Sequence, residues 1–177
     1  KGQPFEEQER AWRELVEQPN QEFYDRLVWD TKYDEHWKEN REKRLRKKLP
    51  ALLEKHERIQ ALFASFEPLL AEQLEKLGRE LDGREMPPIY LVPSLRFNGK
   101  VGFVTREGRE QVVMGFGLDV IAQDDRAGTP LPVLISHEVF HACHMGTLKF
   151  TEAQIMKEAR ITFPLWMEGL AQYVSGM

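Results

Sequence analysis

The chain has 177 residues, of which 41% are hydrophobic and 31% are charged, and its formal net charge is −4. This length can bury one good core with an appended helical subdomain, but not two large domains. The acidic balance argues against a general affinity for nucleic acid, and no run of 18 apolar residues could serve as a transmembrane segment. Because the sequence starts at Lys1 instead of a methionine, we expect that its start was processed or trimmed. A secreted or periplasmic location is slightly favoured over a cytoplasmic one.

Residues 1–86 are predicted to form an N-terminal helical subdomain. Apolar residues recur at steps of three and four from Leu52 to Leu81, which predicts one long amphipathic helix with a kink at Pro68. Earlier apolar positions suggest one or two shorter helices, broken near Pro19 and Asn20.

A small sheet is predicted to follow the two prolines at 87 and 88. Residues 89–92 and 100–105 form its first two strands, with a hairpin turn at Asn98-Gly99 between them. A second turn at Glu107-Gly108 leads to a third strand over residues 111–122. In this last strand the side chains alternate between two faces, and Gly115 and Gly117 lie on one of them.

The most informative stretch is the HExxH motif, His137-Glu138-Val139-Phe140-His141. On an α-helix, residues four apart share a face, so His137 and His141 can direct ring nitrogens at one metal ion. Glu138 lies about 100° round the helix and can reach a water on that ion. Thr129 is a candidate N-cap and Gly146 a candidate stop, so the motif is predicted to lie in the middle of a helix. This is the arrangement of zinc peptidases.

Zinc requires a third protein ligand and leaves a fourth position for water. The extended motif HExxHxxGxxH is excluded because this chain has His144 and Thr147 where that motif has glycine and histidine. His144 is seven residues from His137, about 10 Å along the helix axis, so we expect it in a cleft wall or behind a ligand. Cys143 points nearly opposite to His141 and is expected to be a buried thiol and not a ligand.

Glu168 is the better candidate for the third ligand. It lies in the segment from Pro164 to Tyr173, where the proline can open a second helix. Gly169 and Ala171 are small enough for this helix to approach the first one closely.

The segment Trp166-Met-Glu-Gly-Leu-Ala-Gln-Tyr173 resembles the W-x-x-E-G-x-A-x-Y signature of predicted bacterial zinc-dependent peptidases that are often called MA-like, although its tryptophan lies two residues before the glutamate and not three. With the HExxH motif it is similar to the gluzincins, the group that includes thermolysin. This resemblance covers residues 110 to 177. It implies an α+β fold in which residues 87–177 form a zincin-like domain, with a small sheet, an HExxH helix and a helix that carries a glutamate ligand. It also implies that His137, His141 and Glu168 bind Zn²⁺.

Two departures from the family pattern concern the surroundings of the metal. Thermolysin-type enzymes have an acidic residue four positions after the ligand glutamate, which orients a zinc histidine, and here that position is Gln172. Relatives also continue into a C-terminal subdomain that supplies a tyrosine or histidine to stabilise the oxyanion. Because this chain ends nine residues after Glu168, we expect either a continuation or a substitute role for Tyr173 or His144.

In zincins, the strand before the active-site helix commonly forms the edge of the cleft and pairs with an extended substrate. The resemblance therefore suggests Gly115, Phe116 and Gly117 as the substrate-binding edge, where the glycines would allow close approach of a peptide backbone. Tight packing against a helix, or a bulge, explains the two glycines equally well.

The hypothesis is a zinc metallopeptidase that acts on a peptide or protein. Zinc would acidify a water and polarise the scissile carbonyl, and Glu138 would take the water's proton and pass it to the leaving amine. Phe140, Trp166 and Tyr173 are candidate lining residues. Two alternatives remain open: a noncatalytic zinc-containing module that binds peptides or is structural, and a helical interaction protein in which the motif is fortuitous. The sequence does not indicate the oligomeric state.

Overall fold

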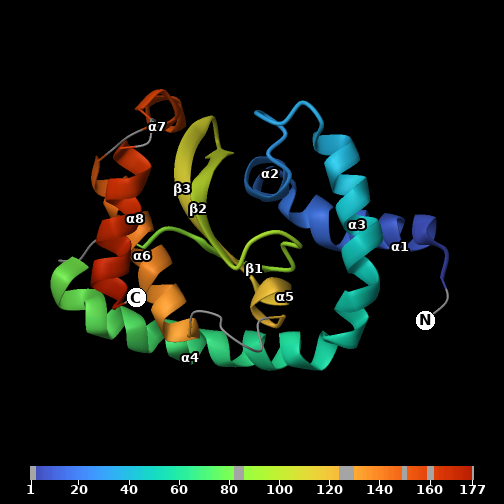
Figure 1. Cartoon of the computed structure of the whole chain (residues 1–177), viewed down its shortest axis with the longest axis horizontal. Helices are drawn as coiled ribbons and strands as arrows, with labels where there is room; N and C mark the ends of the chain where they lie inside the picture. Colours follow the sequence, from blue (N-terminus) through green and yellow to red (C-terminus); the bar gives the residue numbers. More distant parts are fainter. Residues whose placement is uncertain (1–2, 82–85, 124–129, 149–150, 159–161, 177) are drawn as a thin grey trace.

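The protein has an α+β fold in which helices surround a three-stranded sheet (Figure 1). A computed structural model describes residues 3–81, 86–123, 130–148, 151–158 and 162–176. The α+β class predicted from the sequence is confirmed.

Helices make up the first half of the chain. They start with α1 (Phe5–Trp12), a π-helical turn (Arg13–Glu17), a 3₁₀ turn (Gln18–Asn20), α2 (Gln21–Phe23) and a second π-helical turn (Tyr24–Val28). Two longer helices follow, α3 (Trp37–Glu54) and α4 (His56–Leu81). The single helix predicted from Leu52 onwards is therefore wrong at its start, because the chain leaves the helical conformation at Lys55, where φ is −106° and ψ is 4°.

The sheet consists of β1 (Ile89–Val92), β2 (Gly99–Arg106) and β3 (Arg109–Gly117), in the order β1-β3-β2. The predicted hairpin at residues 107–108 is confirmed: it joins β2 to β3, and both turn residues have positive φ, as a type I′ turn requires. The predicted hairpin at Asn98-Gly99 is wrong, because β1 pairs in parallel with β3 and not with β2. The third strand is also shorter than predicted, since Leu118–Ile121 forms a helical turn, α5.

Three helices complete the chain: α6 (Leu131–Leu148), α7 (Glu152–Glu158) and α8 (Thr162–Ser175). The helix predicted around the HExxH motif is confirmed, although it continues through Gly146 to Leu148. The predicted N-cap, Thr129, lies outside the described residues. None of the described helices has both the length and the apolar composition needed to cross a membrane.

Two hydrophobic cores lie on opposite faces of the sheet. β3 contributes to both, because its side chains alternate between the faces. The first core joins the N-terminal helices to the sheet and includes Trp12, Phe23, Tyr24, Leu27, Leu45 and Val113. The second core joins α4 and α6 to the other face and includes Phe66, Leu77, Met114, Phe116, Ile135 and Val139. The predicted boundary after residue 86 does not coincide with a division between the cores, since both contain residues from each side of it.

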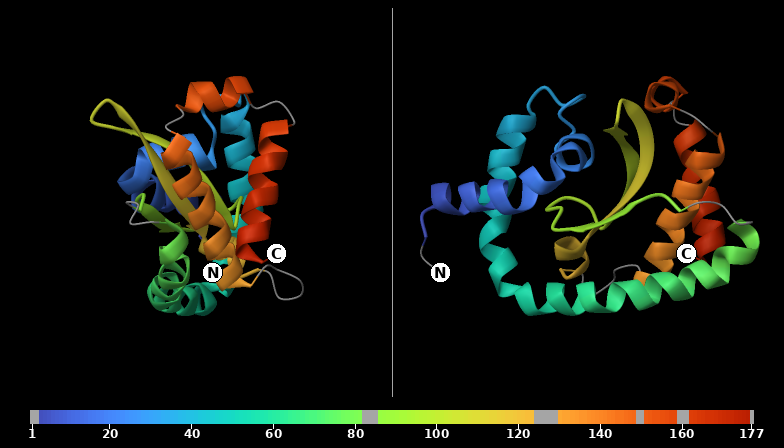
Figure 2. Two further views of the ribbon diagram at one scale, coloured as in Figure 1. Left: turned by 90° about the vertical axis from the view of Figure 1, so that its left-hand side faces the viewer. Right: turned by 180° about the vertical axis from the view of Figure 1, so that it is seen from behind.

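The second core places the HExxH helix beside the sheet. α4 runs along the base of the molecule from α3 to the pair α6 and α8, as the right-hand view of Figure 2 shows. α6 packs against α4, against β2 and β3, and against α8 on its other side. The helix with the motif is therefore buried on several sides, which explains why its apolar residues are not confined to one stripe.

Candidate metal centre and cleft

Two helices bring three potential metal ligands together. α6 carries His137 and His141 one turn apart, and their Nε2 atoms are 3.0 Å from each other. α8 carries Glu168, whose carboxylate oxygens lie 3.3 Å from Nε2 of His137 and 3.4 Å from Nε2 of His141. These three side chains form the group among the described residues whose ligand atoms could hold a metal ion.

The spacing of these atoms matches a tetrahedral zinc site. With zinc about 2.0–2.2 Å from each nitrogen or oxygen, ligand atoms at tetrahedral angles are about 3.3 Å apart. The three observed separations of 3.0, 3.3 and 3.4 Å are close to this value. Two imidazoles and one carboxylate leave a fourth position open, as in catalytic zinc sites. The residues present therefore fit zinc.

The charges of the site also favour a bound cation. Burial, together with the nearby Glu168 carboxylate, raises the pKa of Glu138 to about 8. Among the described residues, no lysine or arginine forms an ion pair with either glutamate. The buried carboxylate of Glu138, close to the half-exposed carboxylate of Glu168, is costly to ionise without a positive charge, which a divalent ion would supply. Burial also lowers the pKa of His141 and so favours the neutral ring that binds metals.

Glu138 is held against the first residue of β2. It is 7% exposed and extends from α6 over Gly99, which has no side chain. A Cβ atom at Gly99 would overlap the carboxylate and would lie 2.6 Å from Cγ of Glu138. The loop before Gly99 is itself anchored, because the buried Asp119 carboxylate accepts backbone hydrogen bonds from Ser94 and Leu95 at 2.7 and 3.1 Å.

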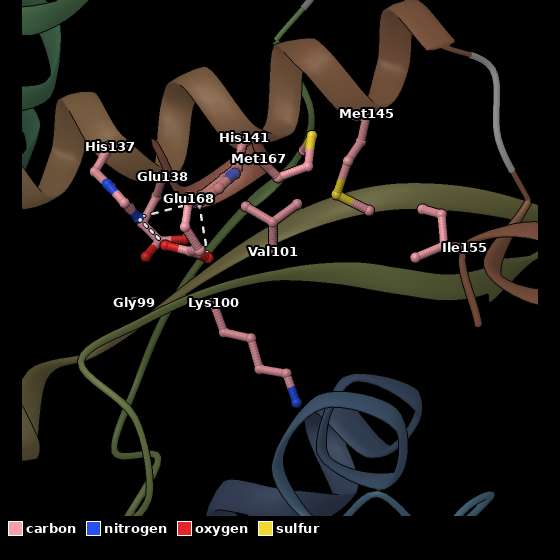
Figure 3. A pocket seen from close by; sticks show the side chains of 10 residues that line it. All are labelled: Gly99, Lys100, Val101, His137, Glu138, His141, Met145, Ile155, Met167 and Glu168. Atoms are coloured by element: carbon pink, nitrogen blue, oxygen red, sulfur yellow. Dashed lines mark hydrogen bonds and ion pairs between the residues drawn. The ribbon is translucent and has the colours of Figure 1, made fainter. Parts of the chain in front are cut away.

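A cavity of about 340 Å³ opens beside these residues (Figure 3). The potential ligands and Glu138 lie at one end, and the remaining lining residues are Gly99, Lys100, Val101, Met145, Ile155 and Met167. Glu168 is half-exposed, so the ligand group is accessible from solvent on the α8 side.

β2, not β3, is the edge strand along this cavity. Gly117 donates its N–H to Asn98 O at 2.9 Å, so residue 98 and every second residue after it direct their backbone groups toward β3. Gly99 and Val101 consequently direct theirs outward. Thr105 lies an even number of residues after Gly99 and Val101, so its backbone also faces outward. Its N–H accordingly donates to the side chain of Glu22.

The prediction that Gly115, Phe116 and Gly117 form the substrate edge is wrong. β3 is the central strand, and both of its edges are paired. The two glycines instead permit tight packing. A Cβ at Gly115 would lie 2.9 Å from Cε2 of Phe23, and one at Gly117 would overlap the backbone oxygen of Phe97.

The other candidate residues lie away from the cavity. His144 packs between Phe140 and Trp166, with ring centroids 5.4 and 5.0 Å away, so none of these three lines the cavity. Tyr173 is 86% exposed and is not positioned to stabilise an oxyanion in this structure. Gln172 is also exposed, and among the described contacts its amide reaches neither His137 nor His141. Nδ1 of His137 is buried without a hydrogen-bond partner in the described part of the chain.

Several cavity residues were missed by the sequence analysis. Met145 lies four residues after His141 and so shares its face, which is a signal that could have identified it. Gly99 was assigned to a turn and not to the site. Ile155 had no local signal, because its position depends on where α7 packs.

Comparisons with known proteins identify no relative. No family model, no curated protein and no solved structure matches this chain.

Proposed function

We propose that this protein is a zinc-dependent metallopeptidase with a zincin-like catalytic core. The observation that carries the proposal is the convergence of His137, His141 and Glu168 at zinc-ligand spacing beside the buried Glu138. A cleft that is bordered by the edge strand β2 adjoins this group. The resemblance of the motifs and the positions of these side chains thus support the same assignment, with His137, His141 and Glu168 as zinc ligands.

Each side chain has a separate role in peptide hydrolysis. His137, His141 and Glu168 would hold zinc, which when bound acidifies water and polarises a carbonyl group. Glu138 accepts a proton from the attacking water and donates it to the departing amine.

The edge of β2 would align the substrate. The outward backbone groups of Gly99 and Val101 border the cavity, and an extended peptide can add to such an edge by main-chain hydrogen bonds. Beyond them, Glu22 already occupies the amide of Thr105. The stretch open to a peptide is therefore short, which suits a few residues around one scissile bond.

A noncatalytic zinc-containing module that binds peptides is the second candidate. One observation favours it, namely the lack of side-chain donors for an oxyanion. Among the described lining residues, only the two proposed zinc histidines and Lys100 have side chains with a nitrogen donor. The ammonium of Lys100 already donates to Leu27 O at 2.9 Å. An oxyanion would then depend on the metal and on backbone donors.

Hydrolysis by a zinc-loaded Glu138→Gln variant separates the two candidates. The amide cannot accept the water's proton, so we expect peptide hydrolysis to fall about 100-fold or more while zinc content stays unchanged. Glu75→Gln, an exposed change on α4, is the control and should behave as wild type. A wild-type protein that binds zinc but cleaves no peptide in a diverse library would favour the noncatalytic module.

A further inference from the structure

The cavity has two chemically distinct halves. His137, Glu138, His141 and Glu168 occupy one end, and Val101, Met145, Ile155 and Met167 line the other. Figure 3 shows the second group displaced along α6 and β2 from the first, with Met145 and Ile155 farthest from the reacting groups. The four residues come from β2, α6, α7 and α8, so the apolar half, hereafter the apolar subsite, is enclosed by four different elements.

No charge enters the apolar subsite from the described residues. Lys100 contributes to the cavity wall, but its side chain turns away toward the N-terminal helices, as Figure 3 shows. Its ammonium is occupied by the backbone oxygen of Leu27. A charged substrate group placed here would lose hydration without gaining a partner, whereas an apolar side chain would be removed from water.

The position of Glu138 sets the direction of the substrate. The residue that protonates the leaving amine must lie near that nitrogen. Glu138 lies over Gly99, at the opposite end of the cavity from Ile155. The amine half of the substrate therefore extends toward Gly99, and the acyl half extends along Val101 toward α7.

We propose that Val101, Met145, Ile155 and Met167 bind an apolar side chain on the N-terminal, acyl side of the scissile bond. This inference rests on the proposed function, because the direction follows from the role of Glu138. Two of the four residues are methionines, whose flexible side chains adapt to different shapes. The subsite consequently selects apolar over charged side chains while discriminating little among leucine, methionine and phenylalanine.

The wall formed by α7 is fixed from outside the cavity. Glu152, at the start of α7, pairs with Arg26 and, at 2.7 Å, with Lys32. Its backbone N–H also donates to the Glu110 side chain at 3.2 Å. Because Ile155 is three residues further along this short helix, these contacts hold it at the end of the subsite.

Hydroxamates of acetylated amino acids test the subsite without requiring turnover. The hydroxamate takes the place of the scissile carbonyl, so the side chain of acetyl-leucine or acetyl-aspartate hydroxamate lies on the acyl side by construction. Calorimetry on the zinc-loaded protein should show at least about tenfold tighter binding of the leucine compound. Met145→Lys should abolish or reverse this preference. Gly146→Lys, which adds the same charge at the next position in open space, should retain it.

Cleavage-site mapping on a peptide library provides the second measurement. Apolar residues should be enriched immediately before the cleaved bond in the wild type, and Met145→Lys should remove the enrichment. Equal binding of the two hydroxamates, binding of neither, or an unchanged preference in Met145→Lys would overturn the subsite. A clear hydroxamate preference in a protein that hydrolyses no peptide would instead uphold the subsite and refute the peptidase.

Discussion

Gly99 and Glu138 depend on each other for space. Glu138 extends across the backbone of Gly99, and the surrounding cavity wall leaves the carboxylate little freedom to move because it is largely buried. Burial restricts the rotamers of a side chain, so the absence of a Cβ at residue 99 determines where the carboxylate of Glu138, the proposed general base, can lie. Gly99 is therefore a positioning residue.

Replacing Gly99 by alanine should lower kcat by about 10- to 100-fold with zinc content and overall fold retained, because Glu138 must leave its place. Gly146→Ala, a substitution on α6 with no atom near the new methyl group, is the matched control and should leave kcat unchanged. Steady-state kinetics with metal analysis makes the comparison. If Gly99→Ala had wild-type kcat, Glu138 would not depend on this contact.

The zinc-free protein should lose stability as the pH rises. The pKa of Glu138 is about 8 in the folded chain, above its ordinary value of 4.5, so between these values the folded state holds a proton that the unfolded state has released. This contribution is complete below about pH 4.5 and is lost as the pH rises through 8. Thermal unfolding in chelator should therefore show a steeper decline from pH 5 to pH 8 for the wild type than for Glu138→Gln. Parallel curves for the two proteins would contradict the assignment.

At the scale of elements, the ion pairs that link α7 to the N-terminal part of the chain, among the described residues, all involve Glu152. The carboxylate of Glu152 forms ion pairs with Arg26 and Lys32, which belong to the N-terminal part of the chain. α7 itself has only seven residues, which is too short for a helix to be stable without tertiary contacts. The N-terminal helices thus help to shape a cavity that they do not line.

Glu152→Ala should raise KM for peptides with an apolar residue before the cleaved bond by roughly three- to tenfold, with kcat changed less. The loss of free energy of unfolding should stay near 1 kcal/mol, as for other partly exposed ion pairs. Hydrogen exchange of residues 152–158 should become faster. Glu72→Ala breaks the exposed pair with Lys76 on α4 and should change neither KM nor exchange in α7. Unaltered exchange in the Glu152 variant would show that other contacts hold α7.

Some elements could be predicted from the sequence and others could not. Elements that depend on interactions between residues close in the sequence were predictable, whereas those that depend on contacts between distant residues were not. The HExxH helix could be predicted because helical periodicity is a local signal. The close approach of α8 was predicted from Gly169 and Ala171, and it holds for the buried Ala171 only, because Gly169 is exposed and a Cβ there would meet no atom within 4 Å. Strand order could not be predicted, since the parallel pairing of β1 with β3 is not local. The packing role of Gly115 depends on Phe23, far away in the sequence, so both explanations for this glycine stayed open until the fold was known.

At the scale of the whole molecule, the candidate metal centre joins α8 to the rest of the fold. α8 buries Met167 and Ala171, whereas Leu165 and Tyr173 on its other faces are exposed. Zinc bound by α6 and α8 together would add a crosslink between a well-packed helix and a poorly covered one. Zinc binding should therefore stabilise α8 more than the rest of the protein.

Hydrogen exchange should report this coupling. On addition of zinc at about 100 times its Kd, the folded state gains about 2.7 kcal/mol by mass action. Amides of residues 162–176 should be protected most, and those of β3 should change least. Glu168→Gln should remove the effect on α8. If zinc protected α8 and β3 equally in the Glu168→Gln variant, zinc would bind elsewhere.

The most direct test of the central claim is the zinc content of the purified protein and its ligand variants. After equilibration with zinc and removal of unbound metal, elemental analysis should find about one zinc per chain in the wild type and in Glu75→Gln. His137→Ala and Glu168→Ala should each contain far less at the same free zinc concentration. Full zinc occupancy in either ligand variant, or no zinc in the wild type, would contradict the metal centre and the hydrolytic function built on it.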